Sequence, residues 1–185
     1  MAGQPSDEIL VDQAQKGDGQ AFEALYQRYL PRVYNRLRAL TPQEDVDDLT
    51  QEVFLAVVRS LTSFERSSTF VTWLYSITNH KISDYYRHRK KREGVERSFA
   101  SQEVRLVVSD PSASAEDRAL VRQVLLCLPE RYRQVLLLRF AEDLSFKEIA
   151  QVMDLSLEAT KSLYRRAVTA AQEEIVGSDK MAARR

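Results

Sequence analysis

Residues 145–166, SFKEIAQVMDLSLEATKSLYRR, constrain the fold of this chain more than any other stretch. Ile149 and Met153 form an apolar pair four residues apart, which is typical of one face of a helix. Residues 154–156 then form a short break, and Ser156 is a good N-cap for a second helix. The sequence therefore predicts a helix-turn-helix, whose second helix enters the DNA major groove.

The outer face of the predicted second helix is basic. Lys161, Ser162, Arg165 and Arg166 fall within about one and a half turns, so several of them can reach one stretch of groove. A bidentate arginine would read guanine, whereas a phosphate contact would only hold the register, and both roles stay open for the two arginines. An unrelated helical hairpin also stays open as an alternative. The residues expected to face inward are Leu157, Thr160, Tyr164, Ala167 and Val168.

Helical patterns recur along most of the chain. Apolar spacing predicts helices over residues 6–16, 18–37, 45–61, 71–92 and 116–128, with a further helix opened by Pro129. A content of 44% hydrophobic residues with five glycines and five prolines favours packed helices over sheet or disorder. Residues 93–115 lack such periodicity and read as a linker. We therefore expect an all-α fold with two small helical domains, residues 6–92 and 116–178, joined by a flexible linker over 93–115.

Charge and composition exclude several classes of protein. The 27 basic and 27 acidic residues cancel, so the arrangement of charge matters more than its sum. No apolar run approaches the 18–20 residues of a membrane span, and the N-terminus does not resemble a signal peptide. The single Cys127 excludes an internal disulfide, suits a reducing cytoplasm and is expected to be buried in its apolar run. We expect a cytoplasmic protein without membrane insertion.

No pattern in the sequence indicates an enzyme. The chain has no glycine-rich phosphate loop, no Ser-His-Asp or Cys-His arrangement and no zinc-ligand spacing, so we expect no catalytic residue, cofactor or metal. Asp45, Asp48 and Glu52 do share one side of a helix and could hold Mg²⁺ as in a nuclease. A solvated or partner-facing acidic surface is the favoured interpretation of these three carboxylates.

A second basic segment, residues 87–92, follows a helix rich in aromatic residues. Proteins that bind single-stranded DNA combine a positive groove with stacking rings. Phe64 and Phe70, in the polar loop before that helix, could supply such rings. Trp73 is expected in the core instead, because its spacing from Leu74 and Ile77 suits packing.

Taken together, these segments resemble a bacterial sigma factor of the extracytoplasmic-function (ECF) group. The resemblance covers residues 13–175 and rests on four blocks in a fixed order. These blocks are GDGQAFEALYQRYLPRVYNRL, DVDDLTQEVFLAVVRSL, FERSSTFVTWLYSITNHKISDYYRHRKK and LPERYRQVLLLRFAEDLSFKEIAQVMDLSLEATKSLYRR. The resemblance implies a transcription initiation factor that performs no covalent chemistry.

The resemblance also implies partners and residues. Core RNA polymerase would bind through its clamp helices and its flap, promoter DNA would be read at the −10 and −35 elements, and an anti-sigma factor is a plausible further partner. The polymerase-binding residues would be Asp45, Asp47, Asp48, Leu49, Gln51, Glu52 and Phe54. The −10 element would be read by Phe64, Phe70, Asn79, His80, Asp84 and Arg87. The −35 element would be contacted by Ser156, Thr160, Lys161, Ser162, Arg165 and Arg166.

Three positions depart from the family pattern. Leu163 replaces a common basic residue, so the preferred −35 sequence cannot be borrowed from a typical member. His80 stands where asparagine is frequent. Asp154 occupies a turn position often held by glycine, and aspartate tolerates the left-handed conformation better than most residues.

The alternative function is a helix-turn-helix regulator that does not engage polymerase.

Overall fold

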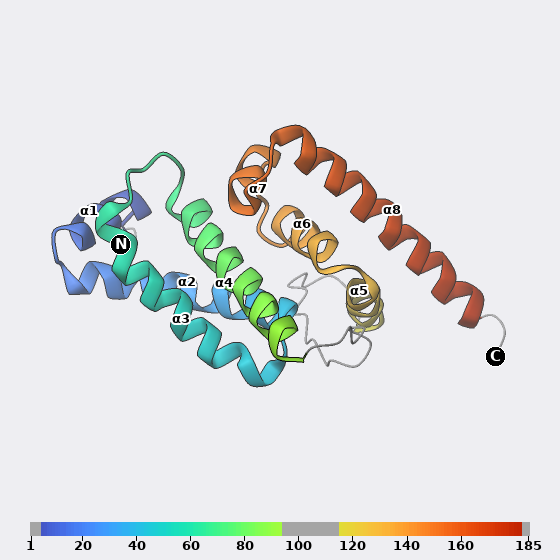
Figure 1. Cartoon of the computed structure of the whole chain (residues 1–185). Helices are drawn as coiled ribbons and strands as arrows, with labels where there is room; N and C mark the ends of the chain where they lie inside the picture. The colour runs from blue at the N-terminus through green and yellow to red at the C-terminus, as the bar shows by residue number, and fades with distance from the viewer. Residues whose placement is uncertain (1–4, 94–114, 183–185) are drawn as a thin grey trace.

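The computed structural model describes residues 5–93 and 115–182, and every regular element in them is helical (Figure 1). This confirms the predicted all-α fold. The predicted linker lies outside the described residues except at its ends. Within the described part of the chain, no helix is both long and apolar enough to cross a membrane. The helices are α1 (Asp7–Gln15), α2 (Gly19–Leu40), α3 (Val46–Ser60), α4 (Phe70–Glu93), α5 (Ala115–Cys127), α6 (Glu130–Phe140), α7 (Phe146–Met153) and α8 (Leu157–Ala182).

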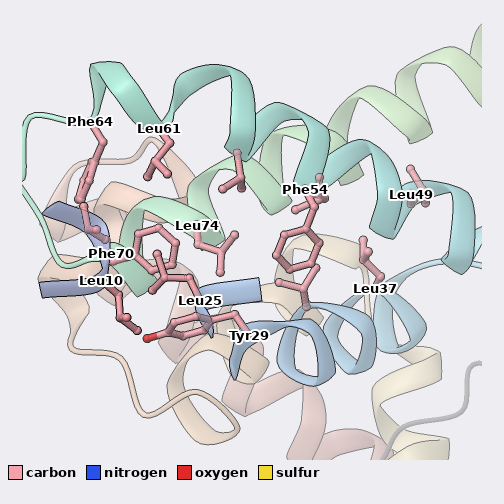
Figure 2. Close-up of a cluster of buried hydrophobic side chains, with 14 of the residues drawn as sticks. Leu10, Leu25, Tyr29, Leu37, Leu49, Phe54, Leu61, Phe64, Phe70 and Leu74 are labelled. Carbon is pink, nitrogen blue, oxygen red and sulfur yellow. The ribbon is translucent and has the colours of Figure 1, made fainter. Parts of the chain in front are cut away.

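Helices α1 to α4 pack around one apolar core (Figure 2). Each helix turns a stripe of large aliphatic residues inward, and full burial of one such side chain stabilises the fold by roughly 1.5–3 kcal/mol. Short 3-10 turns, Gln43–Asp45 and Leu61–Ser63, flank α3 at its two ends. The most deeply buried members of this core include Leu25, Val33, Leu37, Val46, Val53, Leu74 and Ile82.

The start of α2 follows from local chemistry. Gly17 adopts a positive φ of 95° after α1, a conformation that glycine takes without a steric penalty. The Asp18 side chain then accepts hydrogen bonds from the backbone N–H groups of Gln20 at 2.9 Å and Ala21 at 3.2 Å. The predicted helix start at Asp18 is therefore confirmed, and α2 continues through Pro31 to Leu40.

Helices α5 to α8 form a second core, which extends beyond the C-terminal half. Leu138, Ile149 and Ala167 are fully buried there, together with Ala39 of α2 and Tyr75 of α4. Helix α7 packs against α4, and α6 packs against α2. The two halves of the chain are therefore joined by a buried interface that the sequence did not predict.

One burial prediction was wrong. Cys127 is exposed, because Leu125 of α5 and Leu128, just after the helix, face the second core and leave Cys127 on the other side. The apolar run that contains this cysteine continues past the end of α5, so its composition did not reveal which residues face inward.

Glu130, in the first turn of α6, makes stability depend on pH. Burial raises the pKa of its carboxyl group to about 7, with Arg133 and Arg131 opposing the shift. Between the unfolded pKa near 4.5 and about 7, the unfolded chain loses this proton while the folded chain keeps it. The free energy of unfolding therefore falls as pH rises through this window.

Replacing Glu130 by glutamine removes this titration. We expect the Glu130→Gln variant to lose less thermal stability than the native chain between pH 5 and pH 8. Melting curves followed by circular dichroism measure the difference. If the melting temperatures of the two proteins change equally over this pH range, Glu130 is not the group that makes stability depend on pH.

Candidate nucleic-acid interface

A capping box fixes the start of α7. The Ser145 side chain accepts a hydrogen bond from the Glu148 backbone N–H at 3.3 Å, and Glu148 accepts one from the Ser145 backbone N–H at 2.9 Å. The Ser145 hydroxyl contact is the largest cause that holds the pKa of Glu148 below its usual range. The spacing S-x-x-E predicts this motif, and the sequence analysis missed it.

The turn between α7 and α8 matches its prediction. Asp154 has a φ of 52° in the left-handed region, and its backbone N–H bonds to the end of α7. The Ser156 hydroxyl then accepts a hydrogen bond from the Ala159 N–H at 3.1 Å, which confirms the predicted N-cap. These contacts set the angle between α7 and α8, so residues within the turn itself determine the geometry of the helix-turn-helix.

Helix α8 presents four of the predicted DNA-contacting side chains on its outer surface. Arg165 and Arg166 are exposed, and Lys161 and Ser162 are half-buried. Thr160 is fully buried, and its hydroxyl donates to the Ser156 carbonyl at 3.0 Å. Its side chain therefore supports the helix from within. The burial of Thr160 agrees with its predicted inward orientation, whereas Leu157, also expected inward, is 41% exposed. Leu163, which was not among the residues expected to face inward, is buried.

Glu158 modifies the charge of this surface. Its carboxylate pairs with Lys161 at 2.8 Å, and this contact is the main cause that lowers the pKa of Glu158. Both side chains lie in the first turns of α8, where a recognition helix meets base edges. Lys161 is thus partly neutralised before any DNA arrives, whereas Arg165 and Arg166 are exposed further along the helix.

The −10-reading residues predicted on α4 divide into two groups. His80 and Arg87 are exposed, Asp84 is half-buried, and Arg87 forms an ion pair with Asp84. Asn79 is buried, and its side-chain oxygen has no hydrogen-bond partner within the described residues. The structure therefore brings three polar side chains together on the outer surface of α4 and turns the fourth away.

The two phenylalanines predicted to capture DNA lie in the first core. Phe64 and Phe70 are buried, and the Phe64 ring stacks on Trp73 with centroids 4.7 Å apart. The turn that precedes the loop between them is tied to α1, because the Gln15 side chain donates to the Leu61 and Phe64 carbonyls at 2.9 Å. Trp73 packs against the core as expected. The role of the two phenylalanines in DNA capture stays a prediction.

Helix α3 carries a mixed acidic and apolar outer face. Four of the predicted polymerase-binding residues are exposed there, while Leu49 and Phe54 are buried in the first core. Leu55 and Val58 are 53% and 51% exposed on the same helix, and the sequence analysis missed them. The four exposed predicted residues are Asp47, Asp48, Gln51 and Glu52.

Two of the three carboxylates that could hold Mg²⁺ have partners within the protein. The Asp45 carboxylate accepts a hydrogen bond from the Tyr85 hydroxyl at 2.6 Å, and Glu52 pairs with Lys81 at 3.0 Å. Across residues 5–93 and 115–182, no group of three or more His, Cys, Asp or Glu side chains could hold a metal ion.

Two family models match the chain, one in each half. The model of sigma-70 region 2 matches residues 25–92, and the model of sigma-70 region 4 matches residues 118–170. The first match contains α3 and nearly all of α4, and the second contains the helix-turn-helix.

Curated relatives are similar over nearly their whole length. The ECF RNA polymerase sigma-E factor of Escherichia coli K12 is 33% identical over 95% of this chain and 97% of its own length. The protein of the same name in Haemophilus influenzae is 32% identical over 90% and 94%. Among solved structures, CnrH in complex with the cytosolic domain of CnrY has a TM-score of 0.69 at 27% identity, covering 92% of this chain and 97% of CnrH.

The contribution of an exposed α8 arginine to DNA binding can be tested with duplex DNA of arbitrary sequence. We expect Arg165→Ala to weaken binding and to lower the dependence of log affinity on log salt by about one, as for a lost phosphate contact. The Arg59→Ala variant, which removes the same charge from the exposed side of α3, should bind like the native chain. Fluorescence anisotropy titrations at several salt concentrations measure both. An Arg165→Ala variant with native affinity and slope would remove this residue from the interface.

Proposed function

The chain belongs to the family of ECF RNA polymerase sigma factors, and from this premise we propose that it binds core RNA polymerase and directs it to a class of promoters. The observation that carries the proposal is the presence of both sigma regions in one chain, aligned with a sigma-E factor over almost all of both proteins. Sigma factors act in transcription initiation without catalysis of their own. The chemistry of RNA synthesis then belongs to the polymerase.

The outer face of α3 is the proposed docking surface for the clamp helices of the polymerase. Its exposed carboxylates, Asp47, Asp48 and Glu52, favour a basic partner through steering and specificity. Leu55 and Val58 add apolar area beside them, which such an interface can bury. Leu49 and Phe54 shape this surface from below, because both are packed into the core that supports α3.

Promoter reading is proposed for two separate surfaces. Lys161, Ser162, Arg165 and Arg166 of α8 would contact the −35 duplex, and Ser156 and Thr160 would hold the first turn of that helix in place. On α4, His80, Asp84 and Arg87 would meet the opened −10 strand. Asn79, which is buried in this structure, is a further proposed contact. Phe64 and Phe70 would position the loop before α4.

A regulatory protein partner is part of this proposal. CnrH, which is similar to this chain over both halves, was solved in complex with the cytosolic domain of another protein. An anti-sigma factor that binds this chain would control access to α3 and α4. The polymerase flap is the further proposed contact of the C-terminal half.

Run-off transcription with core polymerase tests the proposed function. We expect the native chain to add a promoter-specific transcript, and Asp48→Lys to reduce its yield on the order of tenfold by placing like charges together. The matched control is Glu23→Lys, which makes the same charge change on the exposed side of α2. Genomic fragments that carry candidate promoters serve as templates.

The outcomes separate the two candidate functions. The absence of any added specific transcript with native protein would overturn the proposal. If the chain then still bound specific duplex DNA and did not co-purify with core polymerase, it would be a helix-turn-helix regulator. Equal losses in Asp48→Lys and Glu23→Lys would remove α3 from the docking surface while leaving the function intact.

A further inference from the structure

Glu158 is an acidic side chain on the face of α8 that we propose for the −35 duplex. Buried residues recur at spacings of three and four along the inner side of this helix: Thr160, Leu163 and Ala167. Glu158, Lys161 and Arg165 follow one another at the same spacings on the outer side, and the Glu158 side chain is 78% exposed. A solvent-exposed carboxylate therefore lies among the cations of the proposed recognition surface.

The local structure of α8 does not depend on this carboxylate. The first turn is already capped by the Ser156 hydroxyl, which accepts a hydrogen bond from the Ala159 N–H at 3.1 Å. Glu158 instead pairs with Lys161, with its Oε1 atom 2.8 Å from the lysine Nζ. This contact is the largest cause that lowers the pKa of Glu158, so the carboxyl group is ionised at neutral pH. Because an exposed ion pair adds little to stability, the pair matters mainly for what this surface binds.

A carboxylate on this surface opposes binding to most DNA sequences. The phosphates repel it, and it loses bound water when it enters the groove. This cost is offset only where a base edge offers a hydrogen-bond donor, and in the major groove the donors are the amino groups of cytosine and adenine. A repulsive group whose cost is relieved by one partner alone is a usual source of specificity. Glu158 is therefore suited to discriminate among base pairs.

The pair formed by Glu158 and Lys161 matches the major-groove edge of a G·C pair. Cytosine offers its N4 donor there, and guanine offers its O6 and N7 acceptors. Because N4 and O6 are hydrogen-bonded to each other within the base pair, they lie about 2.9–3.0 Å apart. The separation of 2.8 Å between Oε1 and Nζ is nearly the same. An acceptor and a donor of the protein can therefore meet a donor and an acceptor of one base pair.

An A·T pair fits the same two side chains less well. Its adenine amino group lies beside the N7 acceptor, which repels a carboxylate, and its thymine O4 lies beside the C5-methyl group. In a G·C pair, by contrast, both acceptors of guanine are available to the ammonium group of Lys161. The geometry of the pair thus favours G·C over A·T.

We propose that Glu158 and Lys161 together read one G·C pair of the −35 element, with Glu158 accepting from cytosine N4 and Lys161 donating to guanine O6 and N7. This inference deepens the proposed function and rests on it. Each side chain already holds the other in place, so less conformational freedom is lost when DNA binds. Glu158 is then a specificity-determining residue, although the resemblance to ECF sigma factors did not place it among the −35 contacts.

Run-off transcription from a template library tests this assignment. Holoenzyme assembled from core polymerase and the full-length chain transcribes a promoter first mapped with the native protein, with the −35 element randomised and a barcode in each transcript. The variants are Glu158→Gln, Glu158→Ala and Lys161→Ala. The matched control is Glu173→Gln, which removes the same charge from an exposed position roughly 20 Å further along α8. Circular dichroism confirms that each variant keeps its helix content.

With the native chain, we expect one position of the element at which cytosine is favoured over each other base on the order of tenfold. Glu158→Gln should shift the preference at that position from cytosine to adenine, because a glutamine amide pairs with adenine N6 and N7. Glu158→Ala and Lys161→Ala should lose the preference there and keep those at the other positions within about twofold. Glu173→Gln should match the native chain.

Three results would overturn the inference alone while the native chain still directs transcription. The first is that the two Glu158 variants raise the yield from all templates alike and keep the native base preferences, as for a carboxylate that only weakens Lys161. The second is a native chain without a cytosine preference at any position. The third is a loss of preference over the whole element in the Glu158 variants. A native chain that yields no promoter-specific transcript would overturn the inference together with the proposed function.

Discussion

Helix α4 must bury a wide arc of its surface against two cores, and the rest of the structure depends on this constraint. Leu74 and Ile82 point into the first core, while Tyr75 belongs to the second, and Val71 packs against both. A helix that packs against two cores does not show the usual pattern of one apolar stripe and one solvent-exposed polar face. Polar residues on the side that faces the second core, such as Thr72 and Tyr75, therefore donate hydrogen bonds to carboxylates of the other half of the chain.

Although the net charge of the chain is zero, exposed acidic and basic residues are concentrated on different helices. The acidic residues exposed on α3 and the arginines exposed on α8 lie in different halves, each on a helix whose inner side is anchored in its own core. One surface suits a basic protein and the other suits a phosphate backbone. A single chain can therefore bring a polymerase and a promoter together without a large overall charge.

Local chemistry made much of the fold predictable from the sequence. The start of α2 at Asp18, the left-handed Asp154 and the Ser156 cap each depend on residues within a few positions. The inner face of α8 was harder, because Leu157 and Leu163 are both apolar and only tertiary packing decides that Leu163 is the buried one. The contact between the halves could not be predicted at all, since Arg36, Tyr75 and Glu142 are far apart in the sequence and none of them belongs to an apolar pattern.

Reversible locking of the two halves tests the account most directly. Cysteines placed at Thr72 and Glu148, whose side chains are hydrogen-bonded across the interface, can be joined by a short bis-thiosulfonate linker in a Cys127→Ser background. We predict that the locked chain binds the −35 duplex but directs no promoter-specific transcription by core polymerase, and that reduction of the linker restores transcription. Full transcription by the locked chain would contradict the proposal that the surfaces on α4 and α8 read two separated promoter elements.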